Sequence, residues 1–161
     1  MAVVKHDSST DIFTGQIFLF LGGLPIAYGK SATLNVSVSE VDISNKMVNG
    51  GWGASQYGKK TYTIGSESLV TYKEGQLSFE TLLDMIDKGE NVEFFLGQAK
   101  VSEETTVGGK FEPDTSKPYR KGFAMITSLD LNSTDGEIAT CSTSLTGVGG
   151  LEKGEVTPPT T

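Results

Sequence analysis

Hydrophobic residues recur mainly at every second position of this chain, which is typical of β-strands with one buried face. In the clearest run, residues 32–38, Ala, Leu and Val alternate with Thr, Asn and Ser, and the alternation shifts by one residue before Val41. A β-bulge near residues 39–40 would accommodate that shift. We expect further strands over 61–72, 92–96, 123–131 and 138–145, with a tight turn at Asp135–Gly136. The apolar positions of the strand at 123–131 are Phe123, Met125, Leu129 and Leu131.

One segment has the helical period instead. Apolar residues at i, i+3, i+4 and i+7 predict a helix that begins after Ser78, a good N-cap, and ends at Gly89. We expect this stripe to pack on a sheet, with Leu82 and Ile86 in the core. The stripe consists of Phe79, Leu82, Leu83 and Ile86.

Two glycine-rich segments, 42–60 and 99–120, show no regular period and predict long irregular loops, which are usually functional or disordered. We expect the first to be mobile, because Trp52 is its only large anchor. The predicted fold is mainly β: a two-sheet β-sandwich or rolled barrel with one flanking α-helix and long loops. It forms a single domain over 1–161, with flexible ends at 1–14 and 151–161.

Composition limits the function classes. The chain has 161 residues, a mass of 17.1 kDa and a net charge of -7, which argues against a protein that grips phosphate backbones. Its single cysteine, Cys141, excludes an intramolecular disulfide. No apolar run approaches the length of a membrane span, and the polar N-terminus lacks the apolar core of a signal peptide. We therefore expect synthesis in the cytoplasm and no membrane partner.

Catalytic and metal-binding residue types are scarce. The chain has one histidine, His6, and one cysteine, so neither a Cys-His nor a Ser-His-Asp site is expected, and no His/Cys metal cluster. The stretch Gly23–Ser31 resembles a phosphate-binding loop, but its spacing differs and a strand pattern follows it where a helix is required. We expect no enzyme, no metal and no cofactor.

The order of the parts resembles a known family. A glycine-rich start and a strand are followed by two long strands, joined by a loop that contains Asp42–Lys46 and Gly50–Gly53. Then come the strand Lys60–Gly65, one helix, a strand ending at Gly97, a variable loop and a final Ser/Thr-rich hairpin. From about residue 15 to residue 150 this arrangement is similar to the major tail tube proteins of tailed bacteriophages.

The resemblance implies an assembly as well as a fold. Six subunits would form a ring, rings would stack into a tube, and the inner strands would join into one barrel around a channel through which DNA passes without specific binding. The implied partners are further copies of the chain, tape-measure protein, and tail terminator or baseplate proteins. The implied location is the virion tail, after synthesis in the host bacterial cytoplasm.

Two groups of residues are candidate sites. The loop between the long strands would contact neighbouring subunits through Lys46, Asn49, Trp52, Tyr57 and Lys59. The polar faces of two hairpins, 31–72 and 121–146, are rich in hydroxyls and poor in charge, and would line the channel. Their candidate wall residues are Thr33, Asn35, Ser37, Thr61, Thr63, Ser128, Asp130, Thr140, Ser142 and Ser144.

Two other functions fit the sequence. A carbohydrate- or protein-binding β-sandwich module could use Trp52 as a stacking platform, although only one tryptophan is present and such modules usually sit in larger secreted chains. The tube of a contractile injection or secretion apparatus would share the same fold and ring logic. Assembly into rings or tubes distinguishes the first alternative from a tail tube protein, and neighbouring genes distinguish the second.

Overall fold

The computed structural model describes residues 2–13, 16–47 and 50–158, and this part of the chain is mainly β, with one helix. The mainly-β prediction is confirmed. The elements in chain order are β1 (Phe18–Leu21), β2 (Leu24–Pro25), β3 (Gly29–Asp42), β4 (Ser55–Leu69), α1 (Phe79–Lys88), β5 (Val92–Gly97), β6 (Ala99–Thr105), β7 (Gly108–Pro113), β8 (Arg120–Asn132) and β9 (Thr140–Lys153).

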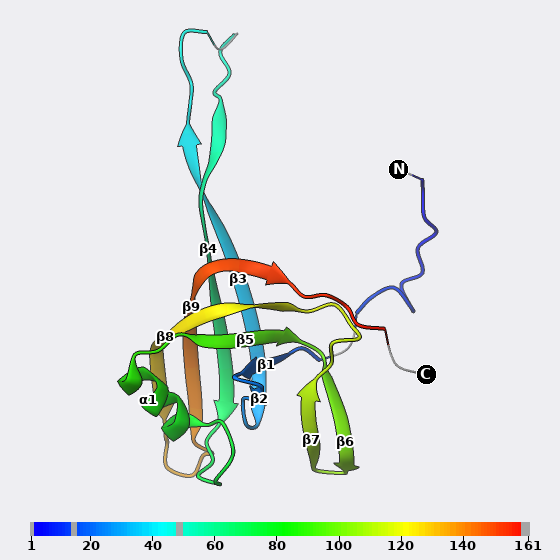
Figure 1. Cartoon of the computed structure of the whole chain (residues 1–161), viewed down its shortest axis with the longest axis vertical. Helices are drawn as coiled ribbons and strands as arrows, with labels where there is room; N and C mark the ends of the chain where they lie inside the picture. The colour runs from blue at the N-terminus through cyan, green and yellow to red at the C-terminus, as the bar shows by residue number, and fades with distance from the viewer. Residues whose placement is uncertain (1, 14–15, 48–49, 159–161) are drawn as a thin grey trace.

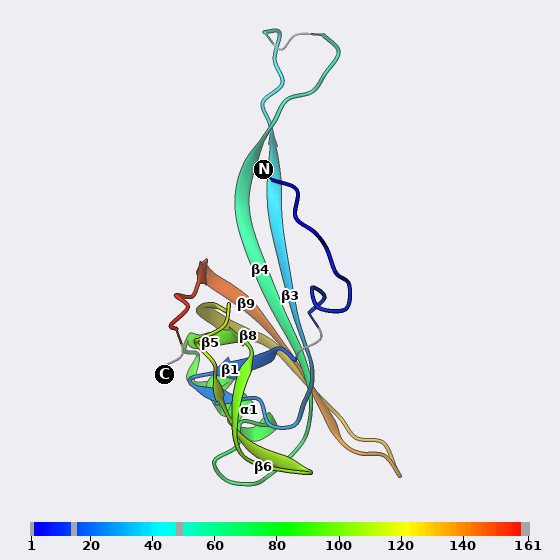
Figure 2. The same cartoon turned by 90° about the vertical axis from the view of Figure 1, so that its right-hand side faces the viewer.

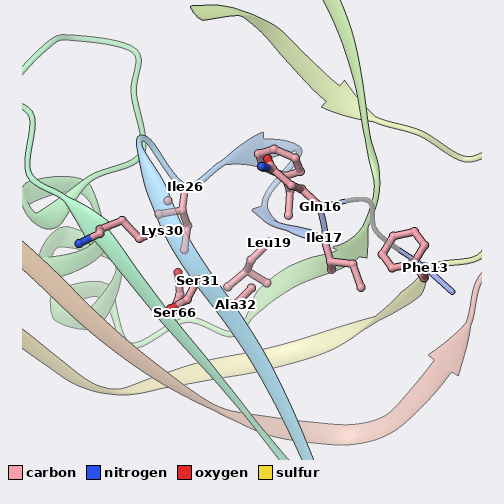
Figure 3. Close-up of a pocket in the computed structure, with 11 residues that line it drawn as sticks. Phe13, Gln16, Ile17, Leu19, Ile26, Lys30, Ser31, Ala32 and Ser66 are labelled. Carbon is pink, nitrogen blue, oxygen red and sulfur yellow. The ribbon is translucent and has the colours of Figure 1, made fainter. Parts of the chain in front are cut away.

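Seven strands form one antiparallel sheet in the order β2-β1-β5-β8-β9-β4-β3, and β6 and β7 form a separate two-stranded ribbon. The large sheet rolls up so that β1 comes into contact with β3, but no ladder joins those two strands among the described residues, and the sheet does not close into a barrel. A cavity of about 450 Å³ lies at this open side, lined by Ile17 and Leu19 on one bank and by Lys30 and Ala32 on the other (Figure 3).

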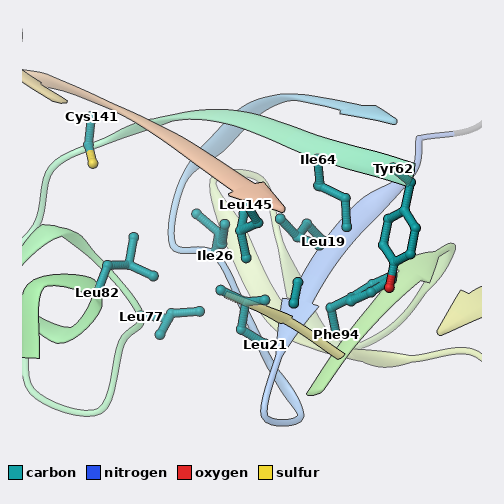
Figure 4. Close-up of a cluster of buried hydrophobic side chains, with 11 residues drawn as sticks. Leu19, Leu21, Ile26, Tyr62, Ile64, Leu77, Leu82, Phe94, Cys141 and Leu145 are labelled. Atoms are coloured by element: carbon teal, nitrogen blue, oxygen red, sulfur yellow. The ribbon is translucent and has the colours of Figure 1, made fainter. Parts of the chain in front are cut away.

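The hydrophobic core fills the inside of the roll. Leu19, Ile64, Phe94 and Leu145 come from four different strands and meet there with almost no exposed surface (Figure 4). Each strand contributes alternate positions, as the period of two predicts, and the intervening positions point away from the core.

Helix α1 closes one end of the core and packs against β8. Leu82 is fully buried, whereas Leu83 on the edge of the stripe is 36% exposed. Gly89 ends the helix in the left-handed conformation, at φ 67°. Ser78 occupies the N-cap, but its hydroxyl accepts a hydrogen bond from the backbone N–H of Thr71 at 3.1 Å and does not cap the helix.

Strands β3 and β4 form a long hairpin that projects well beyond the rest of the molecule (Figure 2). In their ladder, Gly29 pairs with Ser68 at one end and Asp42 pairs with Ser55 at the other. The ladder is interrupted between Val38 and Glu40, where the sequence predicts a bulge. The first buried residue of β4 is Tyr62, so the seven steps from Ser55 to Tyr62 extend about 23 Å past the core at about 3.3 Å each.

Three expectations require correction. The irregular segment at 42–60 is shorter than predicted, because β4 already begins at Ser55 and its backbone groups pair with β3. Much of the segment 99–120 is the β6–β7 ribbon, whose period is hidden by glycines and by a register shift between Ser102 and Thr105. The free C-terminal end starts later than residue 151, because β9 runs to Lys153 and the Gly154 N–H donates to the Tyr119 carbonyl.

The predicted strand at 123–131 exists, but its first half has the opposite orientation. Ala124 and Ile126 face the core, while Phe123 is 53% exposed and Met125 is 46% exposed. A register shift between Ile126 and Ser128 returns Leu129 to the core side. A period of two cannot show where one extra residue inverts the two faces.

Helix packing can be tested with Leu82→Ala. We expect it to lower the free energy of unfolding by about 2–5 kcal/mol, because it leaves a cavity in a closed part of the core. Leu83→Ala, one residue along and partly exposed, is the matched control and should cost much less. Denaturant unfolding of the monomer measures both values, and equal losses would contradict this packing of α1.

The buried thiol of Cys141 gives a second test. Burial raises its pKa, with a smaller raising effect from Asp130 and an opposing one from the Thr143 hydroxyl. Because the folded state holds the proton more tightly, this contribution to stability is complete below the ordinary thiol pKa and is lost as pH rises above about 8.5. Between about pH 7 and pH 10 the wild-type chain should therefore lose more stability than Cys141→Ala. Identical pH profiles in denaturant unfolding would refute the assignment.

Candidate wall surface and projecting hairpin

Four adjacent strands, β3, β4, β9 and β8, present a polar outer face. The ladder registers align their outward residues in rows across the sheet, because directly opposed residues in antiparallel strands share a face. Three consecutive rows are Asn35–Thr63–Thr146–Met125, Thr33–Gly65–Ser144–Ser128 and Ser31–Glu67–Ser142–Asp130.

All ten residues expected to line a wall share this outer face, which we call the hydroxyl face. Seven of them stand in the three rows; Ser37 pairs with Thr61 in β3–β4, and Thr140 pairs with Leu69 and Asn132. The residues between them, Tyr62, Ile64, Cys141 and Leu145, point into the core. Because apolar side chains occupy the inner side of these strands, the hydroxyls are left on the outside. The members of the hydroxyl face are Thr33, Asn35, Ser37, Thr61, Thr63, Ser128, Asp130, Thr140, Ser142 and Ser144.

Charge on the three rows is sparse and negative. Glu67 and Asp130 lie in the same row, one on each side of Ser142. The hydroxyls make few contacts with protein: Thr33 Oγ1 donates to the Gly65 carbonyl at a long 3.4 Å. The face therefore offers water many weak hydrogen-bonding groups and offers a phosphate no strong partner.

The sheet has two free edges beside this face. Strand β3 is the last strand of the seven-stranded order, and it is 14 residues long. On the other side, β8 pairs with β5 only from Arg120 to Ala124. In the described chain, β8 residues 125–132 therefore have a ladder on the β9 side alone. Unpaired strand edges are templates for pairing with another chain.

The projecting hairpin continues the apolar alternation beyond the core. Ala32 and Leu34 pack against the core, while Val36 is 57% exposed and Val38 is 40% exposed on the same side of β3. The pattern of the sequence does not reveal this exposure, because alternation identifies a face without showing whether anything covers it.

The predicted contact residues occupy the outer half of the hairpin. Tyr57 and Lys59 lie in β4, while Lys46 and Trp52 lie in the irregular tip; Asn49 falls outside the described residues. Two side chains organise the base of the tip. Asp42 Oδ1 accepts the Ser44 N–H at 2.8 Å. The Ser44 side chain, and to a smaller extent this N–H, lowers the pKa of Asp42 by hydrogen bonding to its carboxylate.

Reactive groups do not gather on these surfaces. Among the described residues, no three His, Cys, Asp or Glu side chains come together in a way that could hold a metal ion. Cys141 is fully buried beneath the hydroxyl face, where a substrate cannot reach it. No described helix has the length and apolar character needed to cross a membrane.

Comparison with known proteins gives no match to a protein-family model and no significant match to a curated sequence. Solved structures do match. The tail of an empty gene transfer agent particle, solved with C6 symmetry, superimposes with a TM-score of 0.63 at 17% identity and covers 84% of this chain and 93% of its own.

Two further structures are similar to a comparable degree. The SPP1 tail tube has a TM-score of 0.60 at 14% identity, covering 91% of this chain and 81% of its own. The sheath–tube complex of an extracellular contractile injection system, PVC, has a TM-score of 0.61 at 15% identity, covering 94% of this chain and 100% of its own. The resemblance read from the sequence is thus confirmed for the fold: this chain has the fold found in tail tube and injection-system tube structures.

Proposed function

We propose that this protein is the structural subunit of a viral tail tube, in which six copies form a ring and rings stack around a channel for DNA. The observation that carries the proposal is the pair of free edges that flank the hydroxyl face. If β3 of one copy pairs with residues 125–132 of β8 in the next, the four-stranded faces join into one continuous wall. The shared fold with tail tube structures supports this arrangement.

In that assembly the hydroxyl face lines the channel. Hydroxyls make weak, exchangeable hydrogen bonds through water, and Glu67 and Asp130 repel phosphates mildly. Each feature is repeated by every copy in a ring, so DNA meets a uniform surface on which no position holds it. Transit without specific binding follows from this chemistry.

The hairpin supplies contacts between copies. Val36 and Val38 present apolar surface that the parent domain does not cover, and burying it against another copy is favourable by about 25 cal/mol per Å². Lys46, Asn49, Trp52, Tyr57 and Lys59 are proposed to make the more distant contacts. Tape-measure, terminator and baseplate proteins would meet the tube inside and at its ends, in a virion tail built in the bacterial cytoplasm.

The tube of a contractile injection apparatus is a second candidate, favoured by the similarity to the PVC sheath–tube complex. Both candidates predict rings and tubes, and they differ in what passes through the channel. The glycan-binding alternative receives less support, because Trp52 lies in the hairpin tip and lines neither the cavity at the open side of the roll nor the cleft between the β1–β2 turn and the β6–β7 ribbon. Negative-stain electron microscopy of the purified protein at increasing concentration tests tube formation directly.

The hairpin's role can be tested with Val38→Glu. The monomer should stay folded, because Val38 is already partly exposed and Lys60 lies directly opposite it in the ladder. Assembly should be lost, because the new carboxylate would have to be buried between copies. Thr61→Glu places the same charge on the other face of the same hairpin and should still assemble. Sedimentation and electron microscopy provide the readout, and tubes formed by Val38→Glu would exclude this contact.

The channel wall can be tested by adding positive charge. A lysine at position 144 would lie between Gly65 and Ser128 with no acidic residue in its row, whereas one at position 142 would lie between Glu67 and Asp130. Ser144→Lys tubes should therefore retain short duplex DNA at low salt much more strongly than Ser142→Lys tubes. Retention should fall steeply as salt increases, because each phosphate contact releases counterions. If Ser144→Lys tubes passed DNA as the wild type does, the hydroxyl face would not line the channel.

A further inference from the structure

A further cavity, of about 540 Å³, adjoins the one shown in Figure 3 and shares Phe13, Ile17 and Ala32 with it. Its walls are mostly apolar, with Leu34 and Leu96 beside the shared residues. Part of this apolar wall is open to solvent, because Phe13 is 54% exposed and Ile17 is 51% exposed. Exposed apolar surface around a hollow is typical of a ligand-binding site. The volume also lies within the range of about 300–1,000 Å³ that is usual for small-molecule sites.

Two cations lie among these apolar walls. Arg120 of β8 and Lys153 of β9 both line the cavity, and they stand directly opposite each other in the ladder. Leu96 of β5 pairs with Arg120 on its other side and packs against the core, so the two cations are on the inner face of the roll. Like charges directly opposite each other destabilise a strand pair. An anion held between the two side chains would remove that repulsion.

The described part of the chain supplies no acidic partner for this pair of cations. Its one ion pair joins Lys110 to Glu103 in the β6–β7 ribbon. Glu152 is next to Lys153 in the sequence, but it pairs with Lys121 in the ladder and does not line the cavity. The other described residues of the lining are uncharged. The cavity therefore combines an apolar interior with a positive mouth that the domain itself does not neutralise.

The wall beside the cations is held in place by close packing. The Tyr119 ring stacks on Phe95, with the ring centroids 4.5 Å apart. A Cβ atom on Gly154 would overlap the Tyr119 ring, and one on Gly97 would lie 2.7 Å from the Tyr119 Cβ atom. The Gly154 N–H also donates to the Tyr119 carbonyl at 3.0 Å. A wall that is already ordered lowers the entropic cost of binding a ligand.

We propose that this cavity binds a single-chain amphiphile with an anionic head group, a carboxylate or a phosphate. The hydrocarbon chain lies against Ile17, Leu34 and Leu96, while Arg120 and Lys153 hold the head group at the mouth. A peptide is a poorer occupant, because its backbone N–H and C=O groups would face walls that cannot pair with them. The inference goes beyond the proposed tube and does not depend on it.

The head group can be tested by isothermal titration calorimetry of the monomer with three probes below their critical micelle concentrations. Dodecanoate, dodecyl phosphate and dodecyltrimethylammonium share one tail, so at least one of the two anions should bind about tenfold more tightly than the cation, and the tighter anion identifies the head group. Arg120→Gln and Lys153→Gln should each weaken anion binding about tenfold, because each removes a charge-assisted hydrogen bond. Lys121→Gln removes a cation outside the cavity and is the matched control, with wild-type binding expected.

The apolar interior can be tested by filling it. Ala32→Phe places a ring in the cavity and should abolish anion binding, whereas Thr33→Phe adds the same ring on the hydroxyl face and should leave binding unchanged. Denaturant unfolding checks that each variant folds, and the charge variants at the exposed mouth keep the test decisive if Ala32→Phe does not. Equal affinity for all three probes, no binding, or undiminished binding by a folded Ala32→Phe would overturn the site. The tube proposal would still stand, because assembly is measured separately.

Discussion

The rolled sheet depends on how Tyr62 lies across two glycines of the neighbouring strands. A Cβ atom on Gly147 of β9 would overlap the Tyr62 ring, and one on Gly122 of β8 would lie 3.0 Å from the Tyr62 hydroxyl oxygen. The ring packs against Phe94, and its hydroxyl donates to the Phe123 carbonyl at 2.9 Å. Burial, together with a smaller effect of Glu152, raises the pKa of Tyr62. Only strands without side chains at these points can bend so closely over β4.

The Tyr62 contact divides the β3–β4 strand pair into two parts. Below Tyr62 in Figure 1, from Thr63 to Leu69, β4 pairs with β9 and has the core on one side and hydroxyls on the other. Above it, β9 and β8 curve away toward β5, while β3 and β4 continue as the projecting hairpin (Figure 1). The alternation continues unchanged through this point, so Val36 and Val38 carry the apolar side of the hairpin outward without a core to cover it. One continuous pattern thus yields a hydroxyl face backed by the core in one half and uncovered apolar surface in the other.

Local periodicity explains why much of this could be predicted. The mainly-β class, helix α1 and the grouping of Thr140, Ser142 and Ser144 on one face follow from the spacing of side chains along single strands. For the β6–β7 ribbon, by contrast, the sequence predicts an irregular segment, because the pairing depends on a partner strand and the glycines conceal the pattern. Alternation places Phe123 and Met125 on the same face as Leu129 and Leu131, yet one bulge puts the first two on the opposite side of the sheet. The cleft between the β1–β2 turn and the β6–β7 ribbon is formed by segments distant in sequence, and no spacing rule brings them together.

The free edges bear on why such a chain would assemble at all. A 14-residue edge strand and the open half of β8 are liabilities for an isolated subunit, since either could pair with any exposed strand. Pairing one edge with the other restricts that reactivity to a single register, because the hydroxyl face and the core face must both continue across the junction. In the proposed tube, a one-residue slip would set outward residues of one copy against core-facing residues of the next, so neither face would continue across the junction. The alternation that separates wall from core in one subunit is therefore the same constraint that would align the strands between subunits.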